Sequence, residues 1–242
     1  MLDCTWPMPQ SGWPGWRTRI PGVRMAFRSL MRQPIQERPA MTQAMTQDML
    51  TLARLVGSRI CHDIISPVGA ISNGMELIEL TGTAGSPEMS LISDSVAGAN
   101  ARIRFYRIAL GLASSEQMIG PSEITGILSA FYRDTRLDCA WQAEGDVPRD
   151  EAQAVFLALL CAAAALPSGG QLDVAREGPG WRITGAADTM RLHAPLWDML
   201  AGAGNPSVQP SEVQFAMLPV CTAALGRNLG YETDDTSVKI RF

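Results

Sequence analysis

His62 is the residue of this chain best placed for covalent chemistry, and a helical pattern around it shows why. The chain has two histidines. At about 100° per residue, the apolar side chains between residues 56 and 78 fall on one helical stripe, and His62 points roughly 180° away from it. The stripe consists of Val56, Ile60, Ile64, Val68, Ile71, Met75 and Ile78. We therefore expect the imidazole to face solvent, where another protein can reach a ring nitrogen.

The neighbours of His62 suit phosphoryl transfer. Histidine side chains are largely neutral near neutral pH and are nucleophilic in that form. Asp63 can accept a hydrogen bond from one ring N–H, which leaves the other nitrogen free to attack, and Pro67 is expected to bend the helix. The small or polar residues on the same face, which we predict to contact a partner, are Ser58, Arg59, Ser66, Gly69 and Asn73. The simpler interpretation is a surface histidine beside an ordinary acid.

The run from Ser58 to Glu76 resembles known phosphoacceptor sequences. The histidine, the acid and the proline of His62-Asp63-Ile64-Ile65-Ser66-Pro67 are spaced as in the motif of sensor histidine kinases. The longer run is similar to the ChpT family of histidine phosphotransferases, and the chain resembles that family over about residues 50–110. Beyond residue 110, only the order of the predicted elements is similar. The resemblance implies a transferase and phosphoprotein of a bacterial phosphorelay, which moves a phosphoryl group between aspartates of receiver domains through His62, with Asp63 as its orienting acid.

The resemblance also implies partners. The donor would be the receiver domain of a hybrid histidine kinase, the acceptors would be response-regulator receiver domains, and the family suggests a role in cell-cycle control. We expect no cofactor or metal on this chain, because the receiver would bring the Mg²⁺. Two alternatives of a different class remain open. One is an ATP-using histidine kinase, and the other is a non-catalytic dimeric adaptor that binds receivers.

Two long helices are predicted to carry the site. The first covers residues 46–81, and the second runs from Pro87 to about residue 113 with a heptad-like seam. The seam consists of Ile92, Val96, Ala99, Ile103 and Tyr106. A helical hairpin alone buries one side of each stripe, so we expect a homodimer in which two hairpins form a four-helix bundle. The alternative is that the hairpin packs on the chain's own second half.

The second half has mixed patterns. The predicted helices cover residues 124–133, 150–166, 194–201 and 210–228, and the predicted strands cover 137–143, 171–176, 181–185 and, as an edge strand, 237–242. This order predicts an α/β sandwich and resembles a degenerate ATPase domain of histidine kinases. The helix at 152–161 has no asparagine to hold magnesium, and 185–188 is not a nucleotide-binding glycine box. We therefore expect no ATP binding, and an α+β protein overall.

Composition sets the remaining expectations. A net charge of −4 does not indicate the basic surface that binds nucleic acid. No apolar run is long enough to span a membrane. Five scattered cysteines favour free thiols in a reducing cytoplasm. Residues 1–44 hold tryptophans and arginines without periodicity, so we expect a disordered leader, or an over-long start, rather than a membrane or partner arm. The predicted domains are the phosphotransfer and dimerisation hairpin at 45–115 and the ATPase-like domain at 121–242.

Overall fold

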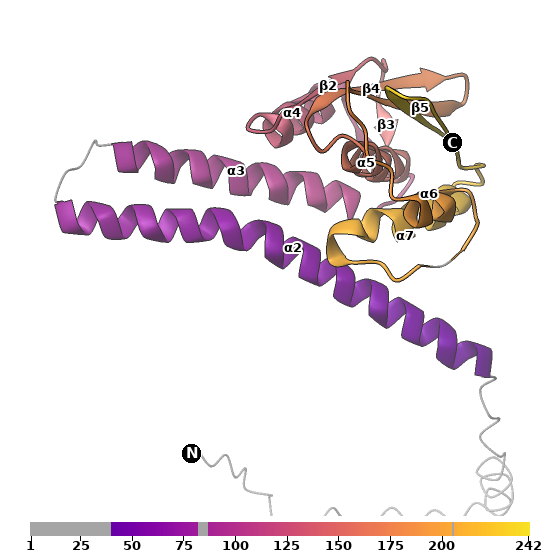
Figure 1. Cartoon of the computed structure of the whole chain (residues 1–242), viewed down its shortest axis with the longest axis horizontal. Coiled ribbons are helices and arrows are strands. Elements are labelled where there is room, and N and C mark those ends of the chain that lie inside the picture. The colour runs from indigo at the N-terminus through magenta and orange to yellow at the C-terminus, as the bar shows by residue number, and fades with distance from the viewer. Residues whose placement is uncertain (1–39, 82–86, 205) are drawn as a thin grey trace, which may run out of the picture. The chain divides into compact units, whose positions relative to one another are not determined.

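The structure is a computed structural model that describes residues 40–81, 87–204 and 206–242 (Figure 1). Residues Gln47–Phe242 form one compact unit. Of the predicted leader at 1–44, residues 1–39 lie outside the described residues. Its last five residues are helical instead, because the first helix already begins at Ala40. Within the described ranges, no helix is both long enough and apolar enough to cross a membrane.

Two long helices open the described chain. Helix α2 covers Ala40–Thr81 and contains Pro67, and Figure 1 shows a bend in its middle, as expected for a helix that lacks one backbone donor. Helix α3 covers Pro87–Ala109. A proline suits a first helical position because its φ is already helical and its missing N–H is not needed there. The predicted second helix was too long by four residues, since α3 ends at Ala109.

A five-stranded sheet forms the second half of the chain, with the strand order β2-β4-β5-β7-β6. The strands are β2 (Leu137–Trp141), β4 (Gly170–Glu177), β5 (Gly180–Ala186), β6 (Gly230–Thr233) and β7 (Ser237–Arg241). β2 runs parallel to β4, and the other neighbours are antiparallel. Alternate residues such as Leu172, Ile183 and Ile240 are fully buried, which is the period of a sheet with one covered face.

Two strand predictions were wrong. Residues 237–242 were expected to form an edge strand, but β7 lies between β5 and β6, and β6 was missed. The segment between the two predicted domains contains β1 (Met118–Ile119), which pairs with β3 (Val147–Pro148).

Helices α4 (Pro121–Tyr132) and α5 (Arg149–Ala164) pack against the sheet. Helix α7 (Val213–Ala224) packs on α5, and α6 (Ala194–Leu200) contacts α7. The helix predicted at 210–228 is shorter and begins with the 3₁₀ turn η1 (Pro210–Glu212). Between Ala152 and Ala162, every side chain of α5 except that of Gln153 is buried. A helix that is apolar on all sides belongs in the middle of a layered domain, and α5 lies there in Figure 1.

One face of α3 is built into the α/β domain. The ring of Phe105 is fully buried, stacks on Phe131 of α4 at 3.8 Å and lies 4.8 Å from the ring of Phe156 in α5. The start of α5 also satisfies the last carbonyls of α3 and of the residues that follow it. Arg149 donates to the carbonyl oxygens of Arg107 (2.9 Å) and Leu112 (3.3 Å). Gln153 donates to that of Gly111 (2.7 Å). On this face of α3, the hairpin therefore packs on the chain's own second half, as the alternative prediction stated.

The predicted dimer seams are divided between two environments. Among the apolar residues of the predicted seams, Val68 (49%), Val96 (42%) and Ile103 (50%) are exposed. Ile60, in contrast, packs against the core, and Tyr106 is 4% exposed. The prediction that Tyr106 belongs to a surface that meets a second copy was therefore wrong. Its hydroxyl points to Asp63 of α2 instead.

Candidate functional site

His62 stands out from the middle of α2, with 87% of its side chain exposed. The predicted partner-binding residues Ser58, Ser66, Gly69 and Asn73 are all exposed on the same helix. A Cβ atom placed on Gly69 would meet no atom within 4 Å, so the surface two turns along the helix from His62 is also open. The structure thus brings these four residues and His62 to one open face, as the helical pattern predicted.

Asp63 connects the imidazole to the interior of the hairpin. Its Oδ1 lies 3.0 Å from His62 Nδ1. Its Oδ2 accepts hydrogen bonds from Arg59 Nε at 2.7 Å and from the Tyr106 hydroxyl. Burial by itself would raise the pKa of Asp63, but the hydrogen bonds from His62 and Tyr106 and the charge of Arg59 outweigh burial and lower that pKa. Asp63 is therefore an ionised carboxylate at neutral pH.

This arrangement selects one tautomer of His62. An ionised carboxylate can only accept hydrogen bonds, so the ring nitrogen that faces it, Nδ1, must carry the proton. Nε2 then holds a free lone pair and points away from Asp63. A nucleophile needs an orienting group on one side and open access on the other, and both are present at His62.

Arg59 lies inside this network rather than at the surface, since its side chain is 17% exposed. Its Nη1 donates to the backbone carbonyl of Ser211 at 2.5 Å, and its Nε and Nη2 each lie 3.3 Å from the Tyr106 hydroxyl oxygen. The guanidinium is therefore used within the chain, and its predicted contact with a partner stays a prediction. Ser211 belongs to η1, so the α/β domain reaches the site through this bond.

Tyr106 is the member of the network that the sequence pattern assigned to the wrong surface. Its ring packs edge-on against Phe131 of α4, with the centroids 5.9 Å apart. Burial raises the pKa of Tyr106 to about 12. The charge of Arg59 opposes this shift, and the hydrogen bond to Asp63 adds to it. The phenol is thus a permanent donor at physiological pH. The sequence did contain a signal for this role, namely a tyrosine on an otherwise apolar stripe. A buried phenol usually forms a hydrogen bond with a polar partner.

The remaining candidate groups do not assemble into a second centre. His193, the second histidine, is exposed at the N-cap of α6. Among the described residues, no three histidine, cysteine or acidic side chains are grouped so that they could hold a metal ion. Cys61 adjoins His62 and is exposed.

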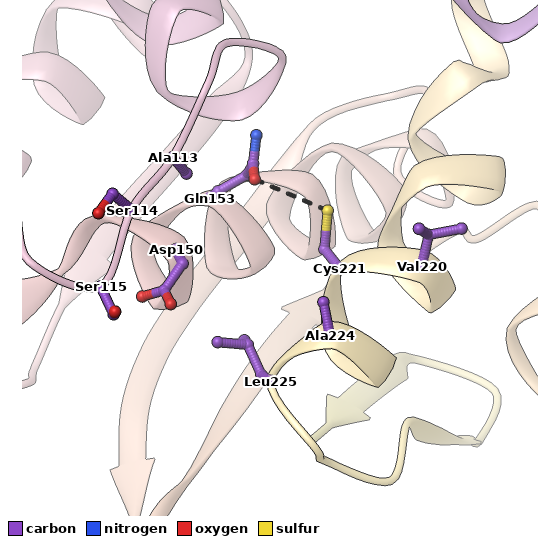
Figure 2. Close-up of a pocket in the computed structure, with 9 residues that line it drawn as sticks. All are labelled: Ala113, Ser114, Ser115, Asp150, Gln153, Val220, Cys221, Ala224 and Leu225. Carbon is purple, nitrogen blue, oxygen red and sulfur yellow. Dashed lines mark hydrogen bonds between the residues drawn. The ribbon is translucent and has the colours of Figure 1, made fainter. Parts of the chain in front are cut away.

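A cavity of about 430 Å³ lies where the segment after α3 meets α5 and α7 (Figure 2). Its polar lining comes from Ser114, Ser115, Asp150, Gln153 and Cys221. The Cys221 thiol donates to Gln153 Oε1 at 3.8 Å, as the dashed line in Figure 2 shows. The lining includes no arginine or lysine, so this cavity offers no cation to a phosphate group.

The fold and the site together define a protein that presents one exposed, carboxylate-oriented histidine on a helix braced by an α/β domain. Three comparisons agree with this class. Residues 121–237 match the family model described as the histidine phosphotransferase C-terminal domain. The chain is 36% identical over 182 residues to the protein phosphotransferase ChpT of Brucella abortus (strain 2308), a match that covers 70% of this chain and 87% of that protein. It is 30% identical to a solved bacterial phosphotransferase, with a TM-score of 0.69 over 79% of this chain and 95% of that one.

This chain therefore belongs to the ChpT family of histidine phosphotransferases. The predicted family, the predicted fold class of helices followed by an α/β domain, and the predicted function in a phosphorelay are confirmed. The individual site residues and the domain boundaries stay predictions.

Proposed function

We propose that this chain relays phosphoryl groups between aspartates of receiver domains through a phosphohistidine at His62, without ATP. The observation that carries the proposal is the geometry of the imidazole. Nδ1 lies 3.0 Å from a carboxylate that is ionised, and the side chain is 87% exposed. Nε2 is thus both nucleophilic and reachable, which a receiver needs in order to bring its aspartate within bonding distance.

The transfer step balances without a further reactant. Nε2 attacks the phosphorus of a receiver's aspartyl phosphate, a P–N bond forms, the P–O bond breaks, and the receiver's carboxylate leaves. The imidazole ring gains positive charge, which Asp63 stabilises through the hydrogen bond to Nδ1–H. The reverse step on a second receiver returns His62 to its neutral form. Because the bonds made and broken are of the same kinds in both directions, the direction of flow follows the supply of phosphorylated receiver.

The partners that fit this step are receiver domains. We assign the donor to the receiver domain of a hybrid histidine kinase and the acceptors to the receivers of response regulators, each bringing its own Mg²⁺. All of them must approach the same nitrogen, so they share the exposed face formed by Ser58, Ser66, Gly69 and Asn73. The alternative of an adaptor that binds receivers without transfer leaves the orientation of the imidazole by Asp63 without a role.

Two features favour a reaction that does not use ATP. Phosphoryl transfer from ATP needs magnesium ligands and phosphate donors. Helix α5, at the place of the magnesium-binding helix of kinases, presents almost only buried apolar side chains and is covered by α7. A Cβ atom on Gly185, where a glycine box would begin, would already touch Leu166, Val238 and Ala162 at 3.3–3.4 Å. The interior around Gly185 is thus filled by side chains, which supports a domain that does not bind a nucleotide.

A homodimer is the assembly we propose, in the cytoplasm. Val68, Val96 and Ile103 are exposed apolar residues of the predicted seams, and they are on the helices that would form a four-helix bundle with a second copy. Large apolar side chains gathered on one surface usually mark an interface. His62 is 87% exposed and points away from the stripe that contains Ile60 and Ile64, so we expect both copies to keep their phosphoacceptors accessible.

The test uses the full chain, a receiver domain phosphorylated with ³²P, and labelled ATP in a separate reaction. Wild type should accept label from the receiver and none from ATP with Mg²⁺. His62→Ala should accept none, and His193→Ala, which changes the only other histidine, should behave as wild type. Helix content should not change, because an exposed side chain contributes little to stability. Label retained by His62→Ala would refute the assignment, and label from ATP alone would revive the kinase alternative.

A further inference from the structure

The hydroxyl of Tyr106 is not needed to fill space. The ring lies in a cluster with Phe105 and Phe131, and a phenylalanine would make the same ring contacts. Tyr132 is a natural comparison, because its ring also packs edge-on against Phe105 and Phe131. Its hydroxyl is buried and has no hydrogen-bond partner among the described residues, whereas that of Tyr106 donates to Asp63. Of two tyrosines in one aromatic cluster, only Tyr106 is directed at the site.

We propose that Tyr106 is a positioning residue of the phosphoacceptor site, whose hydroxyl orients the Asp63 carboxylate so that it holds His62 with Nδ1 protonated and Nε2 free. The assignment rests on the proposed function of His62. Tyr106 does not reach the imidazole itself, since its contact is with Oδ2 of Asp63 and the imidazole lies at Oδ1. It acts on the reaction only through Asp63.

The geometry shows what the hydroxyl adds. Arg59 and Asp63 are four residues apart on the same helix, and such a pair can adopt several side-chain arrangements. Tyr106 donates to the same Oδ2 from the neighbouring helix, so Oδ2 has two donors from different directions. With Oδ2 fixed, Oδ1 is left to face Nδ1. The ring cannot easily move away, because Phe131 of the α/β domain packs against it.

The α/β domain therefore supports the site from two sides. Phe131 holds the ring of Tyr106, and the Ser211 carbonyl holds Arg59. Tyr106 and Arg59 in turn both donate hydrogen bonds to Asp63. The second half of the chain thus has a role in the chemistry at His62, whether or not it also contacts receivers.

The test compares Tyr106→Phe with the matched control Tyr132→Phe, which removes a hydroxyl from the same cluster. Tyr106→Phe should lower the rate constant of transfer from a phosphorylated receiver by about tenfold, the order expected for one hydrogen bond to a charged group. The KM for the receiver should change less than twofold, because the docking face is untouched. Tyr132→Phe should change neither. Nitrogen-15 NMR of the His62 ring should show a larger fraction of the Nε2-protonated tautomer in Tyr106→Phe, a readout that a merely structural role would not move.

A double-mutant cycle with Asp63→Asn gives an independent answer. If Tyr106 acts through Asp63, Tyr106→Phe should cause almost no further loss of rate in the Asp63→Asn background. An equal loss in both backgrounds, or a slower Tyr106→Phe with an unchanged tautomer ratio, would overturn the proposal. The NMR measurement needs no phosphoryl transfer. If His62→Ala refuted the phosphoacceptor role, the tautomer ratio would still decide whether Tyr106 orients Asp63.

Discussion

Replacing Arg59 with lysine separates two roles that this residue can have. Arginine presents a planar fork that binds two partners at once, whereas lysine is a point charge. In the structure, Nε pairs with Asp63 and Nη1 binds the Ser211 carbonyl. If Arg59 positions Asp63, Arg59→Lys should slow phosphoryl transfer nearly as much as Arg59→Met. If Arg59 steers receivers by its charge, Arg59→Lys should behave as wild type.

The expected cost follows from the contacts. A lysine ammonium at this position can take the place of Nε or of Nη1 but not of both, so one hydrogen bond that involves a charged group is lost. Such a bond contributes about 1.5–3 kcal/mol. For a domain of roughly 200 residues, each kcal/mol shifts Tm by about 2–4 °C, which gives a decrease of about 3–12 °C. The 17% exposure of the side chain makes full replacement of this bond by water unfavourable.

Three measurements test the prediction: thermal unfolding, the single-turnover rate of phosphoryl transfer, and receiver association at low and high salt. Arg54→Met is the matched control, since Arg54 is exposed on the same helix. We expect the salt dependence of association to be the same in wild type, Arg59→Lys and Arg59→Met. The reasoning is refuted if Arg59→Lys restores both Tm and transfer, or if Arg59→Met weakens association mainly at low salt, as charge steering requires.

Two further predictions concern alkaline pH and assembly. Because the pKa of Tyr106 is raised from 10.0 to about 12, its contribution to stability is complete below pH 10 and is lost as the pH rises toward 12. Wild type should lose about 3 kcal/mol relative to Tyr106→Phe across this window, at roughly 1.4 kcal/mol per pKa unit. Urea unfolding at three pH values would show no such difference if the phenol were solvated. Ile103→Asp should dissociate the dimer, because burying an unpaired carboxylate costs several kcal/mol, whereas Leu112→Asp, at a side chain 97% exposed, should not. Sedimentation equilibrium decides this point, and a monomeric wild type would contradict the assembly.

The position of His62 could be predicted from the sequence because it depends on local geometry. A stripe of apolar residues fixes the face of a helix that packs, and His62 lies opposite that stripe with 87% of its side chain exposed. Asp63 follows directly in sequence, so its contact with the ring could also be anticipated. Both inferences use only the period of one helix.

Contacts between elements were harder to predict. An apolar residue on a helix is expected to be buried, but the sequence does not say against what. Ile60, Val96 and Tyr106 all belong to apolar stripes of their helices. Nevertheless, Ile60 packs on the α/β core, Val96 is exposed, and Tyr106 binds Asp63. The Ser211 carbonyl could not be anticipated at all, because a backbone oxygen carries no signature of residue type. Strand β6 was missed because Gly230-Tyr231-Glu232-Thr233 has little apolar alternation and is completed by pairing with β7.

The junction between α3 and α5 has a consequence for any attempt to divide this protein. Composition suggests a boundary between the helical hairpin and the α/β domain near residues 115–121. The carbonyls of Arg107 and Ala109 at the end of α3, however, accept hydrogen bonds from Arg149 and Gln153 beyond that boundary. Phe105 is buried against Phe131. A hairpin expressed by itself would leave these carbonyls and this ring to solvent, and the remaining half would lose the helix that covers its aromatic residues. We therefore expect the two halves to unfold together, so that a truncated hairpin is a poor substitute for the whole chain in studies of the phosphorylated histidine.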